Sequence, residues 1–158
     1  MPPNPDGARI ERVDPASPAA RWCMVQYFAE LAERFEHGFD PAHSIPLDEA
    51  EMIPPRGAFL MAQIDGAPVA CGAVKTMAPG VAYLKRMWVA RSARGQGIGR
   101  RMLAALESQA AELGLTTLRL ETNRTLVEAI SLYRRSGYVE VAPFNTEPYA
   151  HHWFEKRL

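Results

Sequence analysis

The spacing of apolar residues predicts three helices in this chain of 158 residues. Apolar positions recur every three or four residues over 97–113, which is the period of an amphipathic helix. A second helix is expected from Pro18 to the stop signal at His37 and Gly38, and a third over 125–136. The pattern places one apolar face on the first of these helices, made of Trp22, Val25, Phe28, Ala32 and Phe35.

Short apolar runs between turn residues predict the strands. Residues 57–64 and 67–77 flank Asp65 and Gly66, a two-residue hairpin signal, and a third strand follows over 81–89. Shorter strands are expected at 8–13, 115–122, 138–142 and 151–154. The order is strand, helix, three antiparallel strands, helix, strand, helix and two strands. This order predicts a single-domain α/β fold with a mixed, mostly antiparallel central sheet flanked by helices.

The segment between the third of the antiparallel strands and the next helix is rich in glycine. Gly95, Gly97 and Gly99 carry no Cβ, so the backbone can turn tightly and approach a ligand closely. The helix that begins there offers unpaired N–H groups, which makes its start an anion site. Over residues 66–106 the sequence has seven Lys or Arg and no acid, although the whole chain is neutral. Such a local excess predicts one anionic ligand at one place.

The spacing of this segment decides which phosphate ligand it fits. A Walker loop needs Lys and then Ser or Thr after its last glycine, and a dinucleotide fingerprint needs a third glycine. The sequence has arginines and a methionine at those positions. What remains is Arg94-x-x-Gly97-x-Gly99, preceded by the strand-ending Val89. This pattern resembles the pyrophosphate motif of the GNAT-type N-acetyltransferase superfamily, whose ligand is acetyl-CoA.

A second stretch, residues 128–138, also resembles GNAT sequence. It has an alanine, then a Leu-Tyr pair that ends at Tyr133, then Gly137 followed by an aromatic residue. Read without the resemblance, the same residues form an ordinary buried helix stripe. With the order of elements, the resemblance extends from about Arg9 to the C-terminus and implies a GNAT-like acetyltransferase domain over 8–158. The proline-rich residues 1–7 are expected to be a disordered leader.

The resemblance implies a role for Tyr133 at the sulfur of coenzyme A. A free thiol has a pKa near 8.5 and a phenol near 10, so full proton transfer runs uphill by about 2 kcal/mol. Tyr133 is therefore expected to donate a hydrogen bond to the departing sulfur. The resemblance also implies the cofactor contacts. The pantetheine arm would be bound by the backbone of Met87, Trp88 and Val89 and by Asn123. The pyrophosphate would be bound by the N–H groups of Gly95, Gln96, Gly97, Ile98 and Gly99 and by the charges of Arg94 and Arg100. For Asn123 a helix N-cap is the alternative.

The general base is less evident, because the strand 81–89 has no acid where many members of the family carry Glu. An attacking amine must be neutral, and an alkyl ammonium has a pKa near 10.4. Glu121 on the next strand is the best carboxylate, although it could instead be a structural partner of Arg119. His151 and His152 point to opposite sides of a strand. They make a poor metal pair, and no spacing predicts a metal site.

The acceptor pocket is expected where the first helix and two loops meet. By the resemblance its lining includes Glu30, Glu33, Asp40, Asp48, Glu49, Glu51, Tyr149 and Trp153. Several acids would suit a cationic amine, whereas Arg56 or Arg86 could receive a carboxylate and favour an amino acid. The sequence leaves this choice open.

These observations predict an enzyme that moves an acetyl group from acetyl-CoA to a primary amine of a small molecule, such as an amino acid or a polyamine, in a ternary complex. A non-catalytic acyl-CoA sensor, and acetylation of a protein N-terminus or lysine, are the alternatives. The zero net charge argues against nucleic acid and membrane partners. Because no secretory or membrane segment is evident, a cytoplasmic location is expected. Cys23 and Cys71 are expected to be buried thiols. Members of the family are often dimers, so a homodimer is possible.

Overall fold

The computed structural model describes residues 7–158. The expected leader therefore lies outside the described residues, except for Gly7. The elements follow in the order β1 (Arg9–Arg12), α1 (Pro18–Arg34), η1 (Pro41–His43), η2 (Glu49–Met52), β2 (Gly57–Ile64), β3 (Ala67–Ala78), β4 (Val81–Val89), η3 (Arg91–Ala93), α2 (Ile98–Glu112), β5 (Thr117–Thr122), α3 (Val127–Arg135), β6 (Val139–Val141) and β7 (His152–Arg157), where η marks a 3-10 helix. Each predicted helix and strand is present, within a few residues of its expected ends.

The strands form one seven-stranded sheet in the order β1-β2-β3-β4-β5-β7-β6. Only β4 and β5 pair in parallel, and every other neighbouring pair is antiparallel. The hairpin between β2 and β3 turns at Asp65 and Gly66, both with positive φ, as a two-residue hairpin turn requires. The predicted mixed, mostly antiparallel α/β fold is confirmed.

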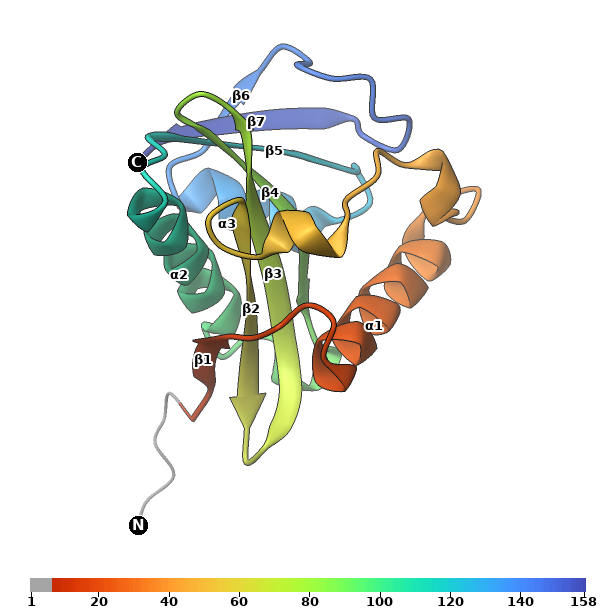
Figure 1. The fold of residues 1–158 in the computed structure, drawn as a ribbon. Helices are drawn as coiled ribbons and strands as arrows, with labels where there is room; N and C mark the ends of the chain where they lie inside the picture. Colours follow the sequence, from red (N-terminus) through yellow and green to blue (C-terminus); the bar gives the residue numbers. More distant parts are fainter. Residues whose placement is uncertain (1–6) are drawn as a thin grey trace.

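Helices cover both faces of the sheet (Figure 1). Along β2, Ala58, Leu60 and Ala62 face the core under α2 and α3, whereas Phe59 and Met61 face the core under α1 and η2. The first six residues of this strand are apolar because both of its faces are buried there. Helix α2 lies so close to β3 that a Cβ at Gly72 would come within 2.6 Å of a Leu106 methyl group.

The face predicted for α1 is wrong in part. Trp22 and Val25 are 47% and 59% exposed, and Ala32 is exposed as well. The residues that α1 buries are Ala20, Cys23, Met24 and Leu31. Apolar residues surround this helix on most sides, so its spacing alone does not fix its rotation, and packing against the sheet decides it.

Two features of β4 open the sheet at its centre. Its parallel pairing with β5 covers only Val81–Tyr83, opposite Thr117–Arg119, and then ends. On its other edge, two residues of β4 face the single Gly72 of β3, which is a β-bulge. Arg86, one of the two, has a φ of 56°. Beyond Tyr83, β4 therefore has no hydrogen-bonded neighbour in β5.

The bulge also changes which side chains share a face. Strict alternation predicts Leu84, Arg86 and Trp88 on one face of the strand and Lys85 and Met87 on the other. In the structure Leu84 packs in the core under α2 and α3, whereas Trp88 packs in the core under α1 and Arg86 contacts Met24 of α1. Leu84 and Trp88 thus lie on opposite faces, because the extra residue of a bulge breaks the period of two.

Candidate active site

A cavity of about 520 Å³ lies between the second half of β4, the glycine-rich loop and the facing sides of α1, α2 and α3. We call it the loop cavity. Gly95 and Gly97 lie in its wall, each with a φ of 78°, and a Cβ added at either would meet no atom within 4 Å. The backbone of this loop is thus bare toward the cavity, as the sequence predicted.

Helix α2 begins at this cavity. Its N-cap is Gly97, and no side chain caps it. The N–H groups of the first turn have no partner within the helix, and they form the positive end of its dipole. An anion in the loop cavity would find these donors at its wall.

The arginines around the loop are less free than the sequence implied. Arg94 forms an ion pair with Glu30 of α1, and its Nε donates to the Val89 carbonyl at 3.1 Å. Arg101 donates to the Ala8 carbonyl at 2.9 Å. Arg100 is exposed and lines the loop cavity, and it forms no ion pair with any residue in the described range 7–158. Arg135, in the same wall, is also exposed and without an ion pair in this range, but its Nε donates to the Ser131 carbonyl at 3.3 Å.

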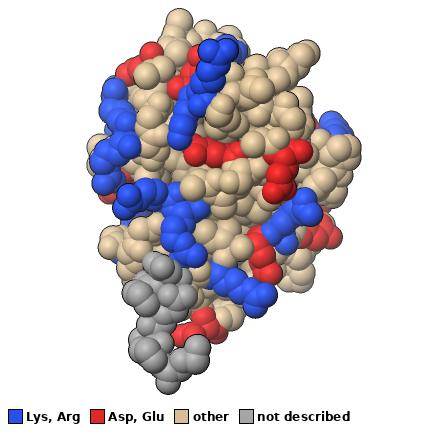
Figure 2. All heavy atoms as spheres, turned by 90° about the vertical axis from the view of Figure 1, so that its left-hand side faces the viewer, with Lys and Arg blue, Asp and Glu red and all other residues tan. Residues whose placement is uncertain are grey.

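The basic run at 66–106 is therefore not a basic patch in space. Acids from distant segments pair with four of its members, in the pairs Lys75–Glu51, Lys85–Glu121, Arg91–Glu33 and Arg94–Glu30. Figure 2 shows basic and acidic side chains interspersed over the face it views. The charge excess along the sequence is largely balanced by the fold.

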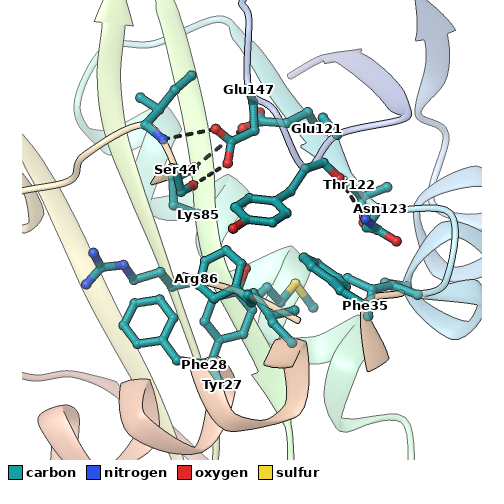
Figure 3. Close-up of a pocket in the computed structure, with 18 of the residues that line it drawn as sticks. Tyr27, Phe28, Phe35, Ser44, Lys85, Arg86, Glu121, Thr122, Asn123 and Glu147 are labelled. Atoms are coloured by element: carbon teal, nitrogen blue, oxygen red, sulfur yellow. Dashed lines mark hydrogen bonds and ion pairs between the residues drawn. The ribbon is translucent and has the colours of Figure 1, made fainter. Parts of the chain in front are cut away.

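A second, smaller cavity of about 120 Å³ opens beside the first (Figure 3). We call it the aromatic cavity. Its wall includes five aromatic rings from α1, the following loop and the β6–β7 loop, together with the bulge of β4 and the end of β5. These rings are Tyr27, Phe28, Phe35, Phe39 and Tyr149. Their contacts include Phe28 stacked on Phe39 and Tyr149 at 4.8 Å from Phe39, between ring centroids.

The two cavities share a wall. The residues common to both linings are Tyr27, Leu31, Met87, Leu126, Ala129 and Tyr133. Tyr133 is 5% exposed, and its hydroxyl makes no hydrogen bond with another described residue. Burial raises the pKa of Tyr133 above its usual value, and Glu121 adds to the shift. The phenol therefore keeps its proton and can act as a hydrogen-bond donor at the junction of the cavities.

Glu121 lies in the wall of the aromatic cavity, with its side chain 4% exposed. One carboxylate oxygen accepts from the Tyr83 hydroxyl and lies 3.4 Å from the Lys85 ammonium. The other oxygen is buried without a hydrogen-bond partner among the described residues. Arg119, the expected alternative partner, instead pairs with Glu155 at 2.8 Å. Glu121 thus keeps one acceptor atom unused.

A network holds the first oxygen of Glu121. Trp153 donates to the Asn145 side chain at 2.9 Å, and Asn145 donates to the Tyr83 hydroxyl at 3.2 Å. Burial, and then the charge of Glu121, raise the pKa of Tyr83. Tyr83 therefore remains a donor to the carboxylate. The sequence showed these residues, but nothing in it signalled that they would meet.

Asn123 and Gln96 lie apart from the loop cavity. Asn123 lines the aromatic cavity, where its amide donates to the Tyr149 carbonyl at 2.8 Å. Its oxygen accepts from the Thr125 backbone and hydroxyl, as in an Asx turn. It is not the N-cap of α3, which is Leu126. Gln96 is exposed and is not among the lining residues.

Most acids expected at the acceptor pocket are engaged elsewhere. Glu30, Glu33, Glu49 and Glu51 form ion pairs with Arg94, Arg91, Arg21 and Lys75. None of these four lines the aromatic cavity. The acid missed by sequence reasoning is Glu147, which is buried there and accepts from the Ser44 hydroxyl and from the Ile45 N–H at 2.9 Å. It ties the loop after α1 to the β6–β7 loop.

The histidines stand outside both cavities. His151 accepts from the Arg124 N–H at 3.1 Å, and burial followed by Arg124 lowers the pKa of His151. His152 contacts Glu140 at 2.7 Å. Within residues 7–158, no group of three or more His, Cys, Asp or Glu side chains is arranged to hold a metal ion. Cys23 and Cys71 are buried free thiols, as expected.

Comparison with known proteins fits this geometry. Residues 24–138 match the model of the acetyltransferase (GNAT) family. The chain is 38% identical over 123 residues to an IAA acetyltransferase of Azospirillum brasilense, covering 77% of this chain and 80% of that protein.

The chain belongs to the acetyltransferase (GNAT) family.

Solved structures of GNAT proteins share the fold. A GNAT acetyltransferase of Staphylococcus aureus superposes with a TM-score of 0.78 at 15% identity, over 95% of this chain and 98% of that one. A GNAT acetyltransferase of Elizabethkingia anophelis, solved with acetyl-CoA bound, gives a TM-score of 0.66 at 14% identity, over 97% and 99%. As a GNAT member, the chain is an acyl-CoA-dependent N-acetyltransferase. No helix among residues 7–158 combines the length and apolar character needed to cross a membrane.

Proposed function

We propose that this GNAT enzyme transfers the acetyl group of acetyl-CoA to the primary amine of a small molecule, by direct attack in a ternary complex. The observation that carries the proposal is the shared wall of the two cavities. Tyr133 stands in that wall, with a protonated phenol that has no other hydrogen-bond partner among the described residues. A thioester in one cavity and an amine in the other would meet beside it.

The loop cavity suits the diphosphate and the pantetheine arm. The main-chain N–H groups of 95–99 and the Arg100 guanidinium would contact the diphosphate. Arg94 would contact the diphosphate only if its guanidinium also kept, or gave up, its ion pair with Glu30. The backbone of Met87, Trp88 and Val89 would pair with the pantetheine amides, because β4 has no β5 neighbour beyond Tyr83. The acetyl-CoA bound in the Elizabethkingia family member supports the same ligand here.

The chemistry needs no covalent acyl-enzyme. The neutral amine nitrogen attacks the acetyl carbonyl carbon, the C–S bond breaks, and the sulfur leaves as the thiolate of coenzyme A. The nitrogen, positively charged once its bond to carbon forms, loses one proton to water and becomes the neutral amide. Tyr133 donates a hydrogen bond to that sulfur as its negative charge develops. Its raised pKa disfavours full proton transfer to the sulfur, so the thiolate takes its final proton from water.

Glu121 is the proposed base. Its unused oxygen, in the wall of the aromatic cavity, would accept a proton from the incoming ammonium, directly or through one water. Tyr83 and Lys85 hold its other oxygen, which orients the carboxylate. Asn123, whose side chain is occupied by Tyr149 and Thr125, would act on the acceptor side of the site, where it shapes the turn that follows the strand of Glu121.

The shape of the aromatic cavity favours a small acceptor over a protein chain. The loop after α1 lies over it and is held down by Glu147, and the Asp40 N–H donates to the Tyr149 hydroxyl at 3.0 Å. A cavity of about 120 Å³ under such a roof fits a compact molecule.

The test is release of free coenzyme A from acetyl-CoA in the presence of candidate acceptors. The panel contains amino acids, polyamines, simple aromatic amines, N-terminal peptides and IAA, which the name of the Azospirillum relative suggests. Acceptance of small amines with no reaction of peptides is the expected result. Acetylation of peptides alone would contradict the proposal. Parallel initial-rate patterns, diagnostic of a covalent acyl-enzyme, would contradict the ternary mechanism.

A further inference from the structure

The aromatic cavity contains one cation without an anion. Four charged side chains line it, namely Lys85, Arg86, Glu121 and Glu147. Lys85 pairs with Glu121, and Glu147 accepts from Ser44 and Ile45. Within the described part of the chain, no carboxylate lies within ion-pair distance of the Arg86 guanidinium. Six other arginines form no ion pair among these residues, and all of them are exposed: Arg9, Arg12, Arg56, Arg100, Arg135 and Arg157.

Arg86 is held in place by weak partners only. Its Nη atoms donate to the Leu47 carbonyl at 3.3 Å and to the Met24 sulfur at 2.9 Å, and its guanidinium lies 5.1 Å from the Phe28 ring centroid. A guanidinium has five N–H donors, so several stay available. Arg86 is partly exposed, and its partial burial lowers the pKa of its guanidinium. A partly desolvated charge without a counter-ion is unfavourable, and a ligand carboxylate would supply one.

The remaining wall fits an apolar body. The rings of Phe28, Phe35, Phe39 and Tyr149 enclose the space between Arg86 and the end of β5. In Figure 3, Arg86 and Phe28 lie at one end of the cavity and Phe35 and Asn123 at the other, with Glu121 and Glu147 along one side. An apolar cavity of about 150 Å³ binds benzene, so about 120 Å³ limits an apolar group to at most roughly one ring.

We infer that the acceptor of this enzyme is a primary amine that also carries a carboxylate, recognised by Arg86, on an apolar body about one aromatic ring in size. The inference rests on the proposed function, because it assigns the amine to the aromatic cavity beside Glu121. The chemical class is that of aromatic or branched apolar amino acids and amino-substituted aryl acids. Polyamines, which bring more positive charge toward Arg86, are disfavoured.

A binding experiment tests the recognition of the carboxylate without any turnover. Calorimetry compares 3-phenylpropionate with its neutral isostere 3-phenylpropanamide on the wild-type protein, Arg86→Gln, Arg86→Lys and Arg56→Gln. Arg56 is exposed and off the cavity, so it is the matched control. We expect the acid to bind on the order of tenfold to a hundredfold more tightly than the amide in the wild type and in Arg56→Gln. That ratio should approach one in Arg86→Gln and be intermediate in Arg86→Lys, which keeps the charge but not the planar fork.

Equal binding of acid and amide by the wild type would overturn the inference without recourse to any variant. An unchanged ratio in a folded Arg86→Gln protein, with folding checked by its melting temperature, would also overturn it.

Turnover gives an independent test. Three amine pairs differ only by a carboxylate: L-phenylalanine and 2-phenylethylamine, 4-(aminomethyl)benzoate and benzylamine, and L-leucine and 3-methylbutylamine. In at least one pair the acid should have the higher kcat/KM, by about tenfold or more. Coenzyme A release without such a preference in any pair contradicts this inference alone. No release with any amine contradicts the proposed function, and the calorimetric comparison then still decides whether Arg86 binds carboxylates.

Discussion

The two cavities of this enzyme are built in different ways. The loop cavity takes about half of its lining residues from one continuous segment, residues 87–100, which offers backbone groups to a ligand, and the rest from α1 and α3. The aromatic cavity takes its wall from α1, the loop after it, the β4 bulge, the end of β5, α3 and the β6–β7 loop. Its chemistry depends on side chains brought together from these six segments. A fixed cofactor can be bound by a local motif, whereas a particular acceptor requires an assembled pocket.

The largest expected effect is at the wall that both cavities share. Tyr133→Phe removes the donor to the departing sulfur, so kcat should fall on the order of a hundredfold to a thousandfold. The KM for acetyl-CoA should change little, since the ring remains. Steady-state kinetics measure both parameters.

Tyr138→Phe is the matched control for that variant. Tyr138 is also buried, its ring lies 5.9 Å from Tyr133, and its hydroxyl donates to Glu107 at 2.8 Å, but it lines neither cavity. Its loss should lower the free energy of unfolding by about 1 kcal/mol and leave kcat unchanged. A Tyr133→Phe enzyme as active as the wild type would remove Tyr133 from the mechanism.

The next effect separates base catalysis from structure. Glu121→Gln should lower kcat/KM for the amine on the order of a hundredfold at neutral pH. The deficit should shrink as the pH approaches the pKa of the amine, near 10.4, because more of the substrate is then neutral without help. A pH profile of the ratio of wild type to variant shows this trend.

Glu155→Gln provides the comparison on the neighbouring strand. It breaks the half-exposed Arg119–Glu155 pair, and exposed pairs contribute only about 0–1 kcal/mol. It should therefore keep full turnover at every pH. A Glu121→Gln deficit that stays constant with pH would indicate a structural role for Glu121.

The difference between the cavities explains what sequence could predict. The glycine loop and α2 followed from local rules, because bare backbone and a helix start are encoded by neighbouring residues such as Gly95 and Gly97. The partner of Glu121, the Glu147 contact and the aromatic wall depend on segments that meet only in the fold. The predicted rotation of α1 was wrong because an apolar helix has no single preferred face. The predicted common face of Leu84 and Trp88 was wrong because a bulge breaks strand alternation.

A substitution at a glycine with positive φ should impair the loop cavity without affecting the aromatic cavity. Gly97→Val places a branched side chain at a φ of 78° and projects it into open space at the cavity wall. The KM for acetyl-CoA should rise on the order of tenfold or more, and the fold should lose about 1–2 kcal/mol from the left-handed backbone. Acetyl-CoA titration and thermal unfolding measure the two losses.

Gly66→Val is the matched control, because it introduces the same backbone strain far from the proposed ligand site. Gly66 has a φ of 80° in the β2–β3 hairpin, with no atom within 4 Å of an added Cβ. It should lose similar stability and keep its affinity for acetyl-CoA. Equal loss of affinity in both variants would mean that stability, and not the loop, accounts for the effect.

A smaller effect is expected on the aromatic cavity alone. Ser44→Ala removes one of the two donors to Glu147 and loosens the roof of this cavity. At about 1 kcal/mol for one hydrogen bond, the KM for the amine should rise about fivefold. The KM for acetyl-CoA should stay constant. A parallel rise of both KM values would show that the two cavities do not act separately.

The last prediction concerns the pH dependence of kcat, in which no effect of Tyr133 ionisation is expected. The pKa of Tyr133 is raised above the usual value near 10, so the phenol stays protonated throughout the range below it. Ionisation of Tyr133 should therefore not lower the wild-type kcat between pH 8 and about pH 9.5. Any decline in this range should also occur in Tyr133→Phe. A decline that Tyr133→Phe abolishes would mean that the phenol ionises earlier than its burial allows.

The most direct test of the account is a crystal structure with coenzyme A and an accepted amine bound together. We expect the diphosphate on the main-chain amides of 95–99, the sulfur within hydrogen-bond distance of the Tyr133 hydroxyl, and the amine in the aromatic cavity beside Glu121. A diphosphate bound away from the start of α2, or a sulfur remote from Tyr133, would contradict it.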